Sequence, residues 1–374
     1  MNFSVIASVA CAIVLVVQVL SLQPAIHFFA EFSVGSVSQL VPTFGAVPER
    51  QPELADLARK NFAPKEILFV GDVMLARNVE FLMRQKGIAY PFAGSVFEQR
   101  GEKFIVGNFE SAIPTNHVPT EAEQMIFSVD ATLLPTLKTV GFTHFSLANN
   151  HSFDHGVLGL ENTKKELFDN ELITFGDPND VNANSVTFID CGKEVVALIG
   201  LHVLEQVPSK QEIESLLMHA GTRSDFQIVY VHWGTEYELS ANDQQRALAT
   251  MLITAGADLI VGHHPHVTQN IEIIDGVPVF YSLGNFIFDQ YFSKETQQGL
   301  TISLDLELAT IELIPVTSEK TISQPRLMSD DERNQFLEDL AIRSAPELQE
   351  AIVRGMVPLN SLVASSPKIA MIEK

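Results

Sequence analysis

The stretch "GADLIVGHHPHV", residues 256–267, decides the fold class. Its apolar run has the length and composition of a buried β-strand. Three histidines, His263, His264 and His266, follow within four positions. The segment before it, 242–256, has the apolar spacing of an amphipathic helix that stops at Gly256. A helix that leads into a buried strand is typical of α/β proteins, in which functional side chains gather beyond the carboxyl ends of strands.

Other segments repeat this pattern. Strand-like runs begin at 66, 103, 144, 194 and 226, and helix-like segments lie at 131–141 and 157–170. From 269 onward, an Asp-Gly turn separates two strand runs, and the following segments alternate apolar and polar residues as half-exposed antiparallel strands do. The sequence therefore predicts an α/β fold with parallel βα units first and antiparallel strands later.

Metal-ligand types follow most of the predicted strands, and we expect them to meet at one edge of one sheet. Carboxylate, carboxamide and imidazole groups together suit Mn, Fe or Zn. The residues at these strand ends are Asp72, Asn108, Glu110, Asn149, Asn150, His151, His232, His263, His264, His266, Asn285 and Asp289.

Each residue also has an ordinary structural explanation. Asp72 can cap a turn, and Glu110 can be a solvated surface acid. Asn150 can cap a helix with His151 as a bystander, and His232 can be a hydrogen-bonded core histidine. No single residue therefore predicts a site. The prediction depends on the number of potential metal ligands that lie at the ends of predicted strands.

The composition limits the partners. Net charge is −22, from 46 acidic and 24 basic residues, so the surface repels phosphate backbones and we expect no nucleic-acid partner. An anionic polymer would be repelled as well, unless bound cations or local basic groups reverse the field. The two cysteines, Cys11 and Cys191, give no disulfide framework.

The N-terminus predicts a membrane anchor. Residues 5–22 carry no charge and almost no polar side chain. At about 1.5 Å per residue they span roughly 27 Å as a helix, close to one hydrocarbon core. A cleaved secretory signal and a soluble helix are the alternatives, but a signal's basic start is missing. We expect an uncleaved transmembrane helix with the body outside the cytoplasm.

The predicted organisation has four parts. A transmembrane signal-anchor covers 1–25 and a proline-containing linker covers 26–64. The main domain covers 65–318, and a C-terminal helical extension and tail cover 319–374. Within this last part, residues 328–355 have a helical pattern and 356–374 are expected to form a loose tail.

Six motifs resemble those of the CapA family of capsule and poly-γ-glutamate biosynthesis proteins. They are "GDVMLAR" (71–77), "GNFESAI" (107–113), "LANNHSFDHG" (147–156), "VHWGTEY" (231–237), "GADLIVGHHPHV" (256–267) and "YSLGNFIFD" (281–289). The resemblance covers about residues 66–305. It implies a calcineurin-like metallophosphoesterase fold, a four-layer β-sandwich flanked by helices, with one or two divalent ions between the sheet edges.

The resemblance also implies roles for single residues. Asp72, Glu110, Asn150, His232, His264 and His266 are the implied metal ligands, with Glu110 bridging, and His151 protonates a leaving oxygen. Asn108 is a further ligand or orients one. On extended backbone, the i, i+2 spacing of His264 and His266 would point both rings the same way, and His263 would face the opposite side and serve packing or support of a ligand.

The sequence departs from the superfamily pattern in two places. Val73 and Met74 follow Asp72 where the pattern has Asp-x-His, and Glu110 replaces an aspartate. Arg77 would point into the site if a helix starts at 73, where its guanidinium could hold a phosphate or carboxylate; a surface ion pair is the alternative.

Four further residues complete the predicted site. Glu236 and Tyr237 are expected at the substrate mouth. Asn149 and Asn285 are expected to contact substrate or support the ligands.

Three functions fit these features. The first is a metal-dependent hydrolase of phosphoesters or amides. The second is a membrane-anchored factor of poly-γ-glutamate synthesis or export, whose partners are the membrane, other subunits of the complex and an anionic polymer or phosphorylated substrate. The third is a non-catalytic scaffold. Whether the chain is an enzyme stays open at this point.

Overall fold

The structure, a computed structural model, describes residues 66–94 and 104–359. The predicted anchor at 1–25, the linker at 26–64 and the end of the chain lie outside these residues. Among the residues that are described, no helix is both long enough and apolar enough to cross a membrane.

The first sheet contains the N-terminal parallel strands and most of the later antiparallel ones. Its strands are β1 (Glu66–Val73), β2 (Phe104–Phe109), β3 (His144–Ser146), β4 (Ile173–Phe175), β11 (Asn285–Ile287), β12 (Gln298–Asp305), β13 (Thr310–Thr317), β14 (Arg326–Leu327) and β15 (Met356–Pro358). The order is β14-β13-β12-β1-β2-β3-β4, with β11 beside β1 and β15 beside β13. Strands β1 to β4 pair in parallel, whereas β12 and β13 are antiparallel, as the sequence predicts.

The second sheet follows in the chain. Its strands are β5 (Val186–Asp190), β6 (Val195–His202), β7 (Phe226–His232), β8 (Leu259–His263), β9 (Ile271–Ile274) and β10 (Val277–Phe280), in the order β5-β6-β7-β8-β10-β9. The predicted hairpin is β9–β10. Its turn has φ of 50° at Asp275 and 86° at Gly276, as the tight turns favoured by Asp-Gly require.

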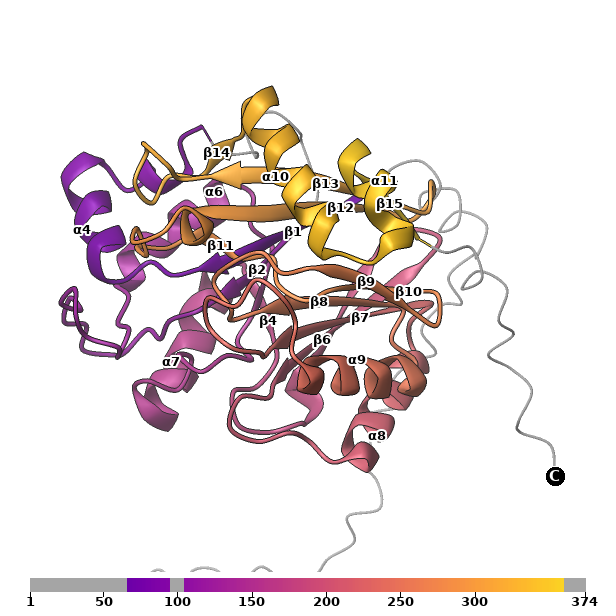
Figure 1. Ribbon diagram of the computed structural model, residues 1–374. Coiled ribbons are helices and arrows are strands. Elements are labelled where there is room, and N and C mark those ends of the chain that lie inside the picture. Colours follow the sequence, from indigo (N-terminus) through magenta and orange to yellow (C-terminus); the bar gives the residue numbers. More distant parts are fainter. Residues whose placement is uncertain (1–65, 95–103, 360–374) are drawn as a thin grey trace, which may run out of the picture. The chain divides into compact units, whose positions relative to one another are not determined.

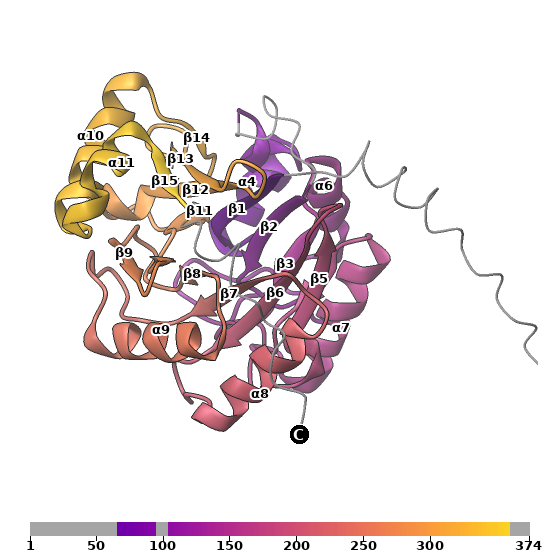
Figure 2. The same cartoon turned by 90° about the vertical axis from the view of Figure 1, so that its right-hand side faces the viewer.

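Helices flank both sheets (Figures 1 and 2). They are α4 (Arg77–Lys86), α6 (Leu134–Thr139), α7 (Gly156–Asp169), α8 (Lys210–Gly221), α9 (Asp243–Ala255), α10 (Asp330–Arg343) and α11 (Gln349–Arg354). Apolar residues of α4, α6 and α7 pack on the first sheet, and those of α8 and α9 pack on the second. The predicted helix before β8 is α9; Asn242 caps its start and Gly256, at φ 117°, ends it.

The main core lies between the two sheets. Phe69 and Val106 of the first sheet and Leu198, Ile228 and Val261 of the second are buried in one apolar cluster. The layers are therefore helices, sheet, sheet and helices. The predicted α/β class is confirmed, with two sheets and flanking helices.

The C-terminal segment is part of this body and not an appended extension. Strands β14 and β15 both pair with β13. Leu337 and Leu340 of α10 and Ile352 of α11 are buried in the same cluster as the inner faces of β12 and β13. Figure 2 shows α10 and α11 beside these strands. Residues 356–358 form a strand where a loose tail is expected, because β13 offers them an unpaired edge.

We expect Leu340→Ala to destabilise the whole domain by about 2–5 kcal/mol, because it opens a cavity in the core between the sheets. Ile342→Ala is the matched control, since Ile342 lies on the same helix with 77% of its surface exposed. Urea unfolding followed by circular dichroism measures both. Equal midpoints for the two variants would contradict the assignment of α10 to the core.

Candidate metal centre

The ends of β1 and β2 place two carboxylates and an amide together. Asp72 pairs in register with Asn108. Nδ2 of Asn108 donates to Oδ1 of Asp72 at 2.9 Å and to Oε2 of Glu110 at 3.2 Å. Only glycine fits before Asp72, because a Cβ on Gly71 would lie 2.0 Å from the carbonyl oxygen of Gly284. Both acids are fully buried, so strand pairing brings two negative charges out of water to one place.

Histidines of the second sheet reach these same carboxylates. Nδ1 of His263 lies 2.8 Å from Oδ1 of Asp72, and Nε2 of His266 lies 3.6 Å from Oε1 of Glu110. The expectation of one edge of one sheet is therefore wrong. The residues converge from two sheets, because the sheets pack face to face with the carboxyl ends of β1, β2, β7 and β8 together.

The histidine cluster does not continue the strand. Strand β8 ends at His263, and φ is 96° at His264 and 58° at His266, a left-handed conformation that is strained for such residues. The expected alignment of two rings on extended backbone is wrong, although the ring centroids of His264 and His266 still lie only 5.8 Å apart. The expectation that His263 faces the opposite side is also wrong, because its ring contacts Asp72 within the site.

The turn after β3 brings a second amide to the site. Oδ1 of Asn150 lies 2.8 Å from Nε2 of His232, across the two sheets. Asn149 supports the turn: its Oδ1 accepts the N–H of His151, and its Nδ2 donates to Oδ1 of Asn108. Asn150 thus faces the site, while Asn149 holds the turn in place.

His151 is held by a carboxylate that the sequence analysis missed. Its Nδ1 lies 2.9 Å from Oδ2 of Asp154, and its ring stacks on Phe127 at 3.9 Å between centroids. A carboxylate only accepts, so Nδ1 carries the hydrogen and Nε2 is the atom left to exchange a proton. The motif "NHSFDHG" contains this signal, because Asp154 lies three residues after the histidine.

Three groups of three side chains in the described part of the chain have ligand atoms close enough to share an ion, and two of these groups lie at the strand ends. Within each group the ligand atoms lie within 4.8 Å of one another. Of the two groups at the strand ends, one is Asp72, Glu110 and His232, and the other is Glu236, His264 and His266. The sequence places Glu236 at the substrate mouth, but the structure brings its carboxylate to the two histidines. The turn at Gly234, with φ 87°, returns the chain toward them after β7.

Buried atoms without partners test whether these residues fit a cation. Oε1 of Glu110, Nε2 of His263 and Nδ1 of His264 are buried and have no hydrogen-bond partner among the described residues. An unsatisfied buried polar group costs about 1–3 kcal/mol. All three atoms are of the type that binds divalent metals. The residues present therefore fit a metal site.

The pKa values of Glu110, His266 and His264 also bear on whether the site can bind a cation. Burial and the nearby Asp72 raise the pKa of Glu110 well above its usual value. Burial acts to lower the pKa of His266, but the Glu110 and Asp72 carboxylates outweigh it and raise that pKa to about 9. Burial lowers the pKa of His264 to about 3, so its ring is neutral, the form that binds metals. A divalent ion bound in place of the Glu110 proton would relieve the repulsion between its carboxylate and that of Asp72.

Arg77 does not present a free guanidinium to the site. It begins α4, so the helix starts at 77 and not at 73. The guanidinium donates to both carboxylate oxygens of Asp289, and Phe127 lies under it with the ring centroid 4.6 Å away. Only 8% of the Arg77 side chain and 6% of Asp289 are exposed, so the pair is not a surface ion pair either. The Arg77 guanidinium, which the sequence analysis expects to hold a phosphate or carboxylate of the substrate, is bonded to Asp289 instead.

Asn285 and Tyr237 lie around His266. Asn285 is in register with Asp72, and its Oδ1 lies 3.0 Å from Nδ1 of His266, so it orients that ring. Tyr237 is 42% exposed, with its ring centroid 6.3 Å from that of His266. Tyr237 therefore presents a partly exposed ring beside His266, and its place at a substrate mouth stays a prediction.

A third acidic group lies on α4, away from these residues. Oε1 of Glu80 accepts from Nε of Arg84 at 2.8 Å and lies 2.9 Å from Nε2 of His117. Arg84 also bonds to Asp130. Arg84 already supplies the positive charge here, so we do not assign a metal to this group.

His202 is a site neighbour that the sequence analysis missed. It ends β6 in register with His232, and the two ring centroids lie 5.9 Å apart. Its Nδ1 donates to the carbonyl of Pro178 at 2.7 Å, and its Nε2 is buried without a partner among the described residues. The strand-end rule finds His202 only if the predicted strand runs two residues beyond Gly200.

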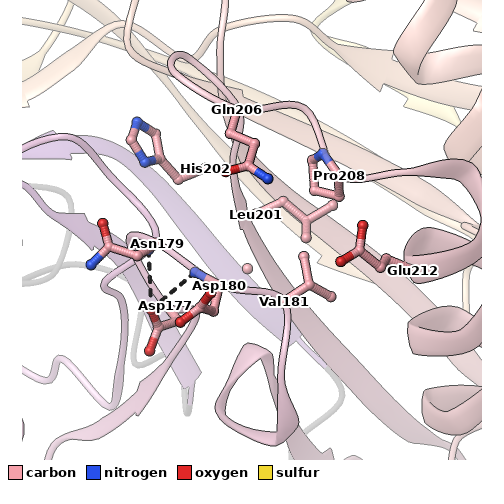
Figure 3. Close-up of a pocket in the computed structure, with 10 residues that line it drawn as sticks. Asp177, Asn179, Asp180, Val181, Leu201, His202, Gln206, Pro208 and Glu212 are labelled. Atoms are coloured by element: carbon pink, nitrogen blue, oxygen red, sulfur yellow. Dashed lines mark hydrogen bonds between the residues drawn. The ribbon is translucent and has the colours of Figure 1, made fainter.

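A small polar pocket of about 50 Å³ lies next to His202. Figure 3 shows Asp177 and Asn179 on one side of it and Glu212 on the other. Asp177 accepts the backbone N–H groups of Asn179 and Asp180, so its carboxylate is used within its own turn. The pocket therefore enlarges the polar surroundings of His202.

Comparison with known proteins identifies the family. Residues 66–290 match the family described as "Bacterial capsule synthesis protein PGA_cap". The chain belongs to this family. It is similar to the PGA biosynthesis protein CapA of Bacillus subtilis (strain 168), with 33% identity over 253 residues, covering 62% of this chain and 65% of that protein, just under two thirds of its length. The capsule biosynthesis protein CapA of Bacillus anthracis is 27% identical over 301 residues, covering 74% of this chain and 73% of that protein. The predicted CapA membership is confirmed.

Solved structures resemble the PGA_cap chain more distantly. A novel phosphatase from Mycoplasma pneumoniae has 13% identity and a TM-score of 0.40, covering 71% of this chain and 91% of that chain. A putative 5'-nucleotidase from Staphylococcus aureus has 13% identity and a TM-score of 0.40, covering 77% of this chain and 58% of that chain. Neither likeness is close enough to decide an activity.

We expect Glu236→Gln to weaken the binding of a divalent ion about tenfold or more, because it removes a charged ligand from the His264 and His266 group. Glu238→Gln is the control, since Glu238 is an exposed acid of the same loop. Competition of the metal-free protein with a chelating dye measures both affinities. Equal affinities for the two variants would exclude Glu236 as a ligand.

Proposed function

We propose that this chain acts in the synthesis or export of an anionic capsule polymer of the poly-γ-glutamate type and uses a divalent metal to do so. Its family and the names of its Bacillus relatives support the pathway. The metal is supported by one observation above all: buried carboxylates and imidazoles from two sheets meet with unpartnered atoms between them.

The ligands proposed from the sequence divide between the two groups. Asp72, Glu110 and His232 would hold one ion, with Asn150 beside His232. His264 and His266 would hold a second ion together with Glu236. Mn, Fe and Zn suit this mixture of oxygen and nitrogen donors. A bound ion of this kind would supply Lewis acidity and lower the pKa of water.

Hydrolysis of a phosphoester or amide is the reaction that the site supports best. In such a reaction water adds across the bond, its hydroxyl going to phosphorus or carbon and its proton to the leaving oxygen or nitrogen. The His151–Asp154 pair favours this reaction, because Asp154 fixes the orientation of the ring while Nε2 can deliver the proton. A non-catalytic role in an assembly is the alternative.

The place of action follows from the N-terminus. The uncharged run at 5–22 supports a membrane anchor with the body outside the cytoplasm. Other membrane subunits of a polymer synthesis or export complex would be its partners there. The net charge of −22 means that an acidic polymer needs local cations to approach this surface.

Two measurements test the proposal. The first is restoration of polymer production in a bacterium whose own CapA has been deleted, by the wild-type chain but not by one carrying His264→Ala and His266→Ala. The second is the metal content of the purified full chain together with its hydrolysis of phosphodiester and γ-glutamyl amide substrates. Restoration by the double variant, or a wild-type chain without bound metal, would overturn the metal-dependent role.

A further inference from the structure

A pocket of about 280 Å³ is lined by residues that follow Tyr237 and His266 closely in the chain and by residues of α10 and of the turn at 294–298. Two cationic residues, Lys294 and Arg343, line it, together with two acids, Glu295 and Asp339. Leu239 and Phe336 add apolar wall. In a chain with nearly twice as many acidic as basic residues, two cations in one pocket call for a physical explanation.

Arg343 lies half-buried in the wall of the pocket and makes one hydrogen bond to the described part of the protein. Its Nη2 donates to the carbonyl of Thr268 at 3.2 Å. Its Nε is buried and has no partner in the described part of the chain. A guanidinium offers several N–H donors in a fork that matches a carboxylate. Such a group is rarely buried unless an anion satisfies it.

The two acids of the pocket do not satisfy Arg343. Among the described residues neither forms an ion pair with Arg343 or Lys294, and Asp339 accepts instead from Nε2 of Gln335 at 3.0 Å. Burial lowers the pKa of Arg343 below its usual value, although Asp339 and Glu295 both act to raise it. The guanidinium therefore remains under-compensated with both acids counted. Lys294 is exposed beside it.

Three segments of the chain connect the lining of the pocket with the metal site. Thr268 lies two residues beyond His266, and the turn that carries Lys294 also provides the carbonyl of Thr296, which accepts from Nδ2 of Asn285 at 3.0 Å. Leu239 lies two residues beyond Tyr237. A polymer that enters beside Tyr237 would thus lie near both the metal site and the pocket.

We propose that Arg343 and Lys294 bind a carboxylate of an acidic polymer whose reacting part lies at the metal site. The polymer's identity, a γ-linked glutamate chain, rests on the proposed function; the carboxylate site rests on the pocket alone. One such contact next to the metals would let a polymer of like charge dock on an acidic protein and would set its direction along the site.

Binding of a fluorescent γ-linked glutamate hexamer to the full chain tests this, measured by anisotropy in detergent and with the metals removed by a chelator. We expect Lys294→Gln and Arg343→Gln each to weaken binding about tenfold. Arg343→Lys, which keeps the charge but loses the fork, should weaken it less. Lys210→Gln is the control, because Lys210 is an exposed lysine on α8. Melting temperatures verify that the variants fold, and Lys294→Gln alters only an exposed side chain.

The outcomes separate this proposal from the metal-dependent role. In the absence of metal, Lys294→Gln should still weaken hexamer binding relative to Lys210→Gln, because the lining of the pocket contains none of the proposed metal ligands. Wild-type affinity in both Lys294→Gln and Arg343→Gln, or no binding by the wild type, would overturn the pocket. Inorganic phosphate that displaces the hexamer as well as glutarate does would also overturn it, since the site would then not select a carboxylate.

Discussion

The His264→Ala/His266→Ala variant will lose tight binding of a divalent ion, with an affinity more than about 100-fold below that of the wild type. Removing even a supporting partner of a ligand costs roughly 10- to 100-fold. The double variant removes two of the three proposed ligands of one group, and only Glu236 remains. Metal content by mass spectrometry and dye competition measure the loss.

Two further variants make this result interpretable. His264→Ala alone removes a ring whose Nδ1 has no partner among the described residues, so the fold should survive while affinity falls. His219→Ala removes an imidazole from the exposed face of α8 and should leave the affinity unchanged. Full metal content in a folded double variant would refute the ligand assignment.

Replacing His151 with alanine will lower kcat by about 10² to 10⁴ while the metal content stays at the wild-type level. The reason is that His151 belongs to neither ligand group, yet Asp154 holds it ready for proton transfer. Asp154→Asn should lower kcat less, because the ring remains and only the hydrogen bond that orients it is altered. A phosphodiester and a γ-glutamyl anilide serve as substrates.

The same turn supplies the control for this experiment. His155→Gln changes an imidazole four residues further along that belongs to neither of the two ligand groups. Undiminished turnover in His151→Ala would remove His151 from the mechanism. A wild-type chain that holds metal tightly but hydrolyses neither substrate would favour the assembly role over the enzyme.

The residues at strand ends illustrate how far prediction from the sequence reaches. Asp72, Glu110, Asn150 and His232 each come shortly after an apolar run, and the structure brings them together. Local rules suffice for Asp72, Glu110 and Asn150, because a strand's carboxyl end is visible in the pattern and parallel strands of one sheet align these ends. His232 ends a strand of the second sheet, and no local rule predicts that this sheet packs on the first. The roles of these residues as ligands stay predictions until metal is measured.

Glu236 and Arg77 show where the same reasoning fails. Glu236 joins the histidines through a turn at Gly234 and Tyr237, both with positive φ, and no periodicity announces such a path. Arg77 is engaged by Asp289, 212 positions along the chain. The sequence contains Arg77 and Asp289 but gives no sign that the two side chains pair.

The sequence by itself determined the family, the α/β class, the β9–β10 turn, the limits of α9 and the strand ends where polar residues gather. Each depends on interactions within a few residues, or on motifs that can be read in order. Only the tertiary structure decided that two sheets contribute to one site, that the C-terminal segment completes the core, and which atoms of the histidines face the acids. Asp72 and His263 lie 191 positions apart, and their contact follows from burying two sheet faces against each other, which is a property of the whole chain.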